Sequence, residues 1–103
     1  MREFIDYQGR RIRLTDERLA HILERPEMAS MEAAISRALL HPEVVRQSRT
    51  DALVHLYYRY YTATIVGDKW LCVVVKYLEA DAFIITAYLT DQLKQGEQRW
   101  PSP

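Results

Sequence analysis

The sequence predicts an α+β fold in which two N-terminal helices pack on one face of a mainly antiparallel sheet of about four strands. Two observations support this prediction. Between Thr15 and His41 the apolar residues recur at helical spacing, whereas after Pro42 they alternate or run continuously, as they do in strands. Because helices that precede a block of strands commonly cover one sheet face, we expect two layers.

The two expected helices have recognisable start and stop signals. Thr15 can cap the first helix, and Pro26 ends it or opens a turn. Ser30 can cap the second, and His41 before Pro42 stops it, because a residue before proline leaves the α region. The second helix has an apolar stripe at i, i+3, i+4, i+7 and i+8, formed by Met31, Ala34, Ile35, Ala38 and Leu39.

The second half of the chain reads as strands joined by short turns. The expected strands span residues 43–48, 54–63, 69–78 and 83–90. Gly67 and Asp68 mark one turn, and a loop at residues 80–82 marks another. The last three strands therefore predict an antiparallel meander, while a short hairpin around Gly9 is expected before the helices.

Length and composition predict one domain over residues 1–103, with residues 95–103 as a loose tail. Lys and Arg number 14, as do Asp and Glu, so the net charge of zero gives no sign of a nucleic-acid partner. Cys72 lies in an apolar run and is expected to be buried rather than reactive. No signal region or membrane span is recognisable, so we expect a cytoplasmic protein without a membrane partner.

The expected strand register sorts the side chains onto two faces. With Gly67 and Asp68 at the centre of the first hairpin, Arg59 lies opposite Lys76, and Lys76 faces Thr86 across the second. The face suited to the helices would hold Tyr58, Tyr60, Val73, Val75, Tyr77, Ile85, Ala87 and Leu89. The other face would hold Tyr57, Arg59, Tyr61, Val74, Lys76, Thr86 and Tyr88.

The expected opposition of Arg59 and Lys76 points to an anion. Like charges directly opposite on a sheet are destabilising, and a phosphate between them would relieve the repulsion. Tyrosine faces beside the pair could stack nucleobases. Alternatively, both side chains reach solvent or pair with carboxylates that the sequence does not place.

A second basic stripe is expected on the first helix, where Arg18, His21 and Arg25 follow at i, i+3 and i+7. If this stripe overlooks the open sheet face, His21 joins Arg59 and Lys76 as a proton carrier. The alternative is an exposed helix histidine beside two solvated arginines. His41 and His55 are weaker candidates.

The available side chains suit cleavage of RNA without a metal. The sequence shows no zinc spacing, phosphate-binding glycine loop or acidic metal cluster, so no cofactor is expected. The 2′-hydroxyl of RNA supplies its own nucleophile. A protein must then move protons and neutralise charge on the phosphorus, which a His, two cations and a Tyr or Thr can do.

The chain resembles the phage-associated branch of the barnase–EndoU–colicin–RelE nuclease-like superfamily from about Leu14 to Trp100. The segments that carry the resemblance are Leu14–Ile22, Arg25–Met28, His41–Val45, Leu56–Tyr61, Leu71–Lys76, Phe83–Asp91 and Lys94–Gly96. The resemblance implies a RelE/barnase-like fold and polar site positions at Arg18, His21, Arg59, Lys76, Thr86 and Tyr88. Relatives often read Arg-His-Pro-Glu where this chain has Glu24-Arg25-Pro26-Glu27.

The resulting hypothesis is a metal-independent endoribonuclease, as in the toxin of a toxin–antitoxin pair. Its expected catalytic residues are His21 as acid or base, Arg59 and Lys76 on the phosphate, and Thr86 or Tyr88 as donor. Flanking nucleotides would contact Arg18, Arg25, Tyr57 and Tyr61. Two alternatives stay open: a non-catalytic RNA- or protein-binding domain, and a homodimer that uses the tyrosine-rich face as its interface. The expected partners are accordingly RNA, an antitoxin protein or a second copy of the chain.

Overall fold

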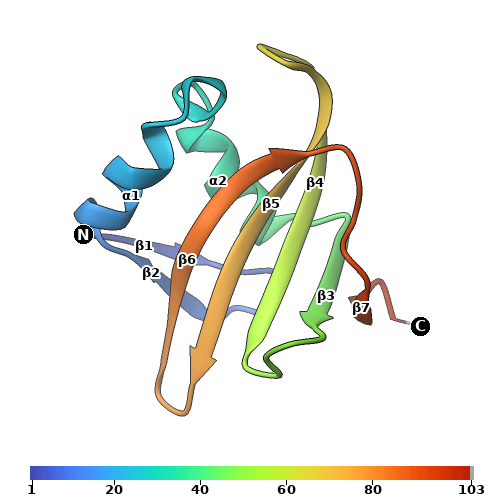
Figure 1. Cartoon of the computed structure of the whole chain (residues 1–103). Coiled ribbons are helices and arrows are strands. Elements are labelled where there is room, and N and C mark those ends of the chain that lie inside the picture. Colours follow the sequence, from blue (N-terminus) through green and yellow to red (C-terminus); the bar gives the residue numbers. More distant parts are fainter. Residues whose placement is uncertain (103) are drawn as a thin grey trace.

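The computed structural model describes residues 1–102 and contains two α-helices, one 3-10 turn and seven strands. In chain order these are β1 (Arg2–Ile5), β2 (Arg11–Leu14), α1 (Asp16–Leu23), η1 (Pro26–Met28), α2 (Glu32–Leu40), β3 (Val44–Ser48), β4 (Val54–Thr64), β5 (Gly67–Leu78), β6 (Asp81–Thr90) and β7 (Gly96–Trp100). The strands form one sheet in the order β1-β2-β6-β5-β4-β3-β7, in which β2 and β6 run parallel (Figure 1).

The expected fold is wrong in two respects. The helices are not N-terminal, because β1 and β2 precede them, and the sheet has seven strands rather than about four. The N-terminal hairpin joins the sheet through the parallel pairing of Arg13 with Phe83. Residues 95–103, expected as a loose tail, contain β7, which satisfies backbone groups along β3 that would otherwise lack partners.

Both helices form where their apolar spacing predicts them. The Thr15 hydroxyl caps α1 and accepts a hydrogen bond from the Arg18 amide at 3.2 Å. Ser30 does not cap α2: Met31 occupies that position, and its side chain gives no cap hydrogen bond. The chain between the helices instead tightens into η1, which begins at Pro26.

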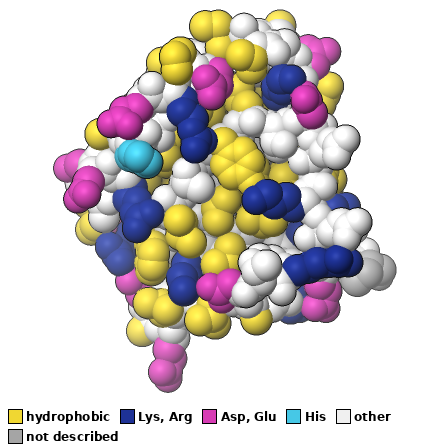
Figure 2. Space-filling view, viewed as in Figure 1, with side chains coloured by type: hydrophobic (Ala, Val, Ile, Leu, Met, Phe, Trp, Pro, Cys, Tyr) yellow, Lys and Arg dark blue, Asp and Glu magenta, His cyan; other side chains and the backbone are white. Residues whose placement is uncertain are grey.

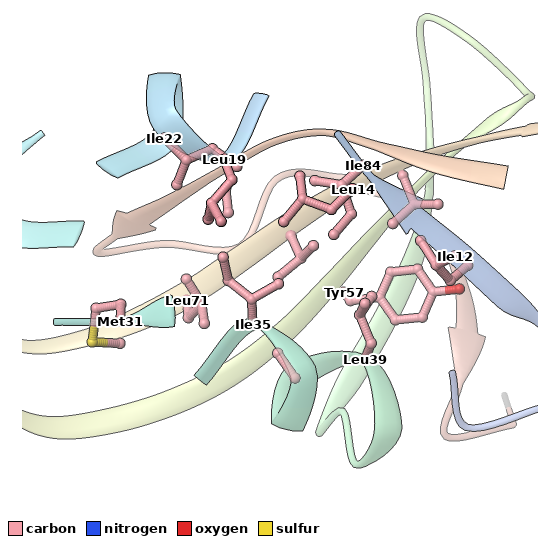
Figure 3. Close-up of a cluster of buried hydrophobic side chains, with 14 of the residues drawn as sticks. Ile12, Leu14, Leu19, Ile22, Met31, Ile35, Leu39, Tyr57, Leu71 and Ile84 are labelled. Atoms are coloured by element: carbon pink, nitrogen blue, oxygen red, sulfur yellow. The ribbon is translucent and has the colours of Figure 1, made fainter. Parts of the chain in front are cut away.

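The main core lies between the helices and one face of the sheet (Figure 3). From the helices, Leu19, Ile22, Ile35 and Leu39 point into it. From the sheet it receives Ile12, Leu14, Tyr57, Leu71, Val73, Val75, Ile84 and Ala87. We call this side of the sheet the helix-covered face and the opposite side the open face.

A carboxylate lies inside the helix-covered side. Asp6 is 1% exposed and accepts hydrogen bonds from the hydroxyls of Tyr57 at 2.7 Å and Tyr77 at 3.2 Å. The backbone amides of Gln8 and Arg10 donate to its other oxygen, each at 2.9 Å, and the Arg10 guanidinium lies 3.4 Å away. The buried charge is therefore fully paired, as buried charges must be.

The expected register of the β4–β5 hairpin is wrong. Arg59 pairs with Leu71, and Lys76 pairs with Val54. The turn is Ile65 and Val66, two residues before its expected position, and Gly67, with φ of +97°, follows the turn instead of forming its centre. An irregularity between Tyr61 and Thr64 shifts the pairing by one further residue. The partner of Arg59 is therefore five residues away from the expected one, Leu71 instead of Lys76. Because five is an odd number, the β4 side chains expected on the open face lie on the helix-covered face, and the reverse.

The β5–β6 register also differs from expectation, with the opposite consequence. Leu78 pairs with Asp81, which leaves a two-residue loop, and an irregularity between Val74 and Val75 lets Val74 pair with Thr86. Lys76 therefore pairs with Phe83 and not with Thr86. Val74 was expected to pair with Tyr88 and pairs with Thr86, two residues away. Because two is an even number, the β6 side chains from Thr86 onward keep their predicted faces.

Candidate functional site

The open face has an apolar cluster of its own. Val54, Leu56, Tyr58 and Cys72 are buried there, and Val44, Trp70, Val74, Ile85, Tyr88 and Leu93 pack against them. Residues 91–95, which connect β6 to β7, lie against this cluster: Leu93 belongs to it, and the Lys94 amide donates to the Tyr58 hydroxyl at 3.0 Å. The Arg46 guanidinium holds the same segment by donating to the Lys94 carbonyl at 3.0 Å.

Two cations lie close to the Tyr88 ring on this face. The Arg25 guanidinium carbon is 6.0 Å from the ring centroid, and the Lys94 ammonium is 5.6 Å from it. Both distances lie within the range of cation–π attraction. Figure 2 shows apolar side chains in the middle of the visible face with Lys and Arg side chains on several sides of them. We call Tyr88, Arg25 and Lys94 the Tyr88 site.

The Tyr88 hydroxyl cannot donate a proton to a substrate in this conformation, which corrects one expected role. This oxygen is buried and has no hydrogen-bond partner within residues 1–102. Burial raises the pKa of Tyr88 above its ordinary value, and the neighbouring Cys72 thiol raises it further. Burial likewise raises the pKa of Cys72 to about 11, so this cysteine is neutral and, as predicted, buried. Tyr88 therefore offers its ring rather than its hydroxyl.

A cavity of about 370 Å³ continues from the Tyr88 site along the open face. Thr86 lies in it, which confirms the face expected for this residue. Its apolar lining includes Val54, Leu56 and Val74, while Arg49, Asp51 and Lys94 lie among its polar residues. The arrangement suits a ligand with flat apolar surfaces and negative charge.

Lys76 lies near the Thr86 cavity but is already neutralised. Its ammonium is 3.2 Å from a carboxylate oxygen of Asp51, one of the cavity's lining residues. The pKa of Asp51 is lowered first by the hydrogen bond from the Leu53 amide and then by Lys76. Lys76 therefore has the carboxylate partner that the sequence could not place.

The basic stripe, with Arg18 in α1 and Arg25 just after it, contacts the edge of β6. Arg18 donates to the Ile85 carbonyl at 3.0 Å, and Arg25 donates to the Ala87 carbonyl at 3.4 Å. His21 lies between them in the chain with a side chain 74% exposed, and its Nδ1 is 3.4 Å from Glu24. The structure thus brings Arg25 to Tyr88 and leaves His21 at the solvent-exposed flank of the helix.

Three expected site residues lie on the other face. Tyr57 is fully buried in the main core, and Tyr61 packs against it. Arg59 donates to the His41 carbonyl at 2.7 Å, near the end of α2. Because Arg59 and Lys76 belong to opposite faces, the expected clamp on a shared phosphate does not exist.

Lys94 is the functional candidate that the sequence prediction missed. It follows the last predicted strand in Lys94-Gln-Gly, a segment that carried part of the family resemblance but received no role. A long-range contact places it over Tyr88, and no local spacing could show that.

No family model matches the chain, and neither the curated proteins nor the solved structures contain a match to it. The superfamily resemblance therefore stays a prediction. Among residues 1–102, no helix combines the length and the apolar character needed to cross a membrane. The same residues gather no group of three His, Cys, Asp or Glu side chains placed to hold a metal ion.

Proposed function

We propose that this protein binds single-stranded RNA across the open face of its sheet. The observation that carries the proposal is the Tyr88 ring with the Arg25 and Lys94 cations close to it. An aromatic ring can stack a base of any sequence, and the two cations can contact the flanking phosphates. Single-stranded segments suit such a site because their bases are free to splay onto it.

The surroundings of the Tyr88 site support the same proposal. The cavity next to it, lined by Thr86, Val74 and Leu56, offers room for a second base. Arg18 has one guanidinium nitrogen bound to a carbonyl and no ion pair within the described residues, so its charge remains available. The site therefore presents unpaired positive charge next to apolar surface, although the net charge of the chain is zero.

The test is fluorescence anisotropy with a labelled 12-nucleotide RNA of mixed sequence, in EDTA and at several salt concentrations. Tyr88→Leu keeps apolar packing but removes the ring, and should weaken binding about 5- to 150-fold. Arg25→Gln and Lys94→Gln should each reduce the slope of log affinity against log salt by about 0.7.

The matched control is Arg37→Gln, which removes an exposed charge from α2 on the other side of the sheet. It should leave both affinity and salt slope unchanged. The proposal fails if the native protein shows no saturable, salt-sensitive binding. It also fails if Tyr88→Leu, shown to be folded by its circular dichroism, binds as tightly as the native protein.

Metal-independent RNA cleavage is a second candidate, favoured by the position of His21 four residues before Arg25. The histidine could move a proton while Arg25 and Lys94 stabilise the charge that develops on the phosphate. Position 25 is also where relatives in the resembling superfamily often carry a histidine, and in this chain it lies at the Tyr88 site. Toxicity and an antitoxin partner would follow only from this candidate.

Cleavage is tested with the same RNA in EDTA, followed by gel electrophoresis over a range of pH. His21→Ala should lose cleavage while keeping most of the affinity for RNA. A single-stranded DNA of the same sequence, which lacks the 2′-hydroxyl, should bind but stay intact. If the native protein returns the RNA uncut at every pH, the enzyme hypothesis is wrong and the binding proposal stands alone.

A further inference from the structure

A second hollow lies on the other side of the sheet from the Tyr88 site. It has a volume of about 690 Å³, within the range of about 300–1,000 Å³ typical of small-ligand sites. Its lining comes from four separate parts of the chain, namely Tyr7 and Gln8, Leu40 to Pro42, Arg59, and the residues Arg99, Trp100 and Ser102. We call it the Arg59 groove.

The charge of the Arg59 groove is one-sided. Among the described residues, its lining includes two arginines, Arg59 and Arg99, and no carboxylate. Arg59 forms no ion pair within residues 1–102, and its recorded hydrogen bond goes to the His41 carbonyl. Arg99 is partly compensated, because it lies 2.6 Å from the Gln47 side-chain oxygen and 3.7 Å from Glu97. A half-buried guanidinium with no counter-charge favours an anionic ligand.

An aromatic pair lies in the same groove. The rings of Tyr7 and Trp100 have centroids 5.4 Å apart at an angle of 43°. Trp100 is fixed by its indole nitrogen, which donates to the Pro42 carbonyl at 3.2 Å, yet 41% of the residue remains exposed. A ring that is held in place and still open to solvent can stack a planar group at low entropic cost.

An adjoining hollow of about 460 Å³ extends the polar surface. It shares Tyr7, Gln8 and Arg99 with the Arg59 groove and adds Arg10 and His55. The Nδ1 atom of His55 is buried and has no hydrogen-bond partner within the described residues. The two hollows together place hydrogen-bonding groups beyond the aromatic pair.

We propose that the Arg59 groove binds a nucleobase joined to a phosphate, with the base on Trp100 and the phosphate at Arg59 and Arg99. The ligand is a free nucleotide or the phosphorylated end of an RNA, which present the same chemistry. The proposal does not depend on RNA binding by the open face, because the two sites share no residue.

The test is titration of the full chain with adenosine monophosphate, followed by tryptophan fluorescence. Stacking on Trp100 should give a saturable decrease in emission, which Trp100→Phe removes. Trp70→Phe should keep the decrease, because Trp70 lies with Tyr58 in the open-face cluster. Arg59→Gln should weaken binding about 10- to 100-fold, as expected when a hydrogen bond to a charged group is lost. Arg49→Gln, a basic residue of the open face, should have no effect.

Four further ligands define what the groove recognises. Adenosine should bind at least tenfold more weakly than its monophosphate. Two short RNAs of one sequence, with and without a 5′-phosphate, are compared in the Tyr88→Leu background, and preference for the phosphorylated RNA identifies the RNA end as the ligand. Binding of the monophosphate without that preference identifies the free nucleotide. Inorganic phosphate that binds as tightly as the nucleotide would overturn the proposal, since no base would then be needed.

Nuclear magnetic resonance on the native protein removes any dependence on the folding of variants. Adenosine monophosphate should shift the Trp100 indole proton and the amides near His41 and Arg59. The absence of saturable shifts, or shifts confined to the open face, would overturn the proposal.

Discussion

Two neighbouring tyrosines of β4 show how differently the faces of the sheet are built. Tyr57 and Tyr58 are both fully buried. On the helix-covered face, the Tyr57 hydroxyl donates to Asp6, whose remaining lone pairs are also occupied. On the open face, the Tyr58 hydroxyl accepts from the Lys94 amide, in a segment without regular structure. Burial is equal, but one residue is fixed by a core carboxylate and the other by a connecting segment.

The difference indicates how the two faces divide their roles. On the helix-covered face, the Asp6 network pairs the buried carboxylate with two tyrosine hydroxyls and two amides, and such networks favour stability and a unique core. The open face leaves the Tyr88 hydroxyl unpaired and gathers cations over its ring. Proteins tolerate such departures mainly at functional sites. The following experiments test this division, beginning with the largest expected effect.

Removing the core carboxylate should cause the largest loss of stability. Asp6→Ala leaves the hydroxyls of Tyr57 and Tyr77 buried without an acceptor, and should lower the free energy of unfolding by about 3–5 kcal/mol. Urea denaturation measures the loss. Asp91→Ala is the control, because its carboxylate is exposed and should cost at most about 0.5 kcal/mol. Equal losses of unfolding free energy in Asp6→Ala and Asp91→Ala would contradict the proposed division of roles between the two faces.

The two tyrosines themselves provide a matched pair. Tyr57→Phe removes a donor to a carboxylate and should cost about 1.5–3 kcal/mol, whereas Tyr58→Phe removes an acceptor of one neutral amide and should cost about 1 kcal/mol. Thermal and urea unfolding of both variants test the order. A larger loss for Tyr58→Phe would show that the open face contributes more to stability than the helix-covered face.

His55 should make the stability of the helix-covered side depend on pH. Burial lowers the pKa of His55, and the charges of Arg10 and Arg99 lower it further. As the pH falls below about 6.5, the unfolded chain takes up this proton before the folded chain, so stability decreases until the folded pKa is passed. Urea midpoints from about pH 7.5 to about pH 5 should fall less in His55→Gln than in the native protein. An identical fall would assign the pH dependence to other groups.

The smallest expected effect concerns a charge pair of the open face. The pKa of Asp51 is lowered mainly by the Leu53 amide and secondarily by Lys76. Lys76→Ala should therefore raise this pKa while leaving it below the ordinary value, since the amide still donates. Carbon-13 NMR titration measures both values. If the pKa of Asp51 returns to its ordinary value in Lys76→Ala, Lys76 is the main cause of the lowered pKa. If the pKa does not change, the ion pair of Asp51 with Lys76 is absent in solution.

The sequence predicted the helices well because their apolar spacing has one solution. Ile35 and Leu39 reach the core from the expected stripe of α2, and Leu19 and Ile22 reach it from α1. The strands of the meander were placed within a few residues for the same reason. Residues 70–75 of β5 form a continuous apolar run, so the assignment of Val73 and Val75 to the helix-covered face depended on placing Lys76 on the open face.

The faces of β4 could not be predicted because its residues do not distinguish them. Tyr57, Tyr58, Tyr60 and Tyr61 are all amphipathic, so either set of alternate residues can face the core. The choice then depended on the turn, which lies at Ile65 and Val66 rather than at Gly67, and on an irregularity between Tyr61 and Thr64. Thr86 kept its expected face only because the error in its pairing was an even number of residues. The contacts of Lys94 and β7 depend on long-range pairing, which local patterns do not contain.

The arginines beside α1 have a consequence for how the chain behaves at high concentration. An uncovered strand edge invites pairing with another chain, and β6 is covered by β2 only near Phe83. Beyond that point the carbonyls of Ile85 and Ala87 are occupied by Arg18 and Arg25. The outermost strands, β1 and β7, are short and rich in charged residues. The long, apolar central strands are thus kept from the edge-to-edge contacts that begin aggregation.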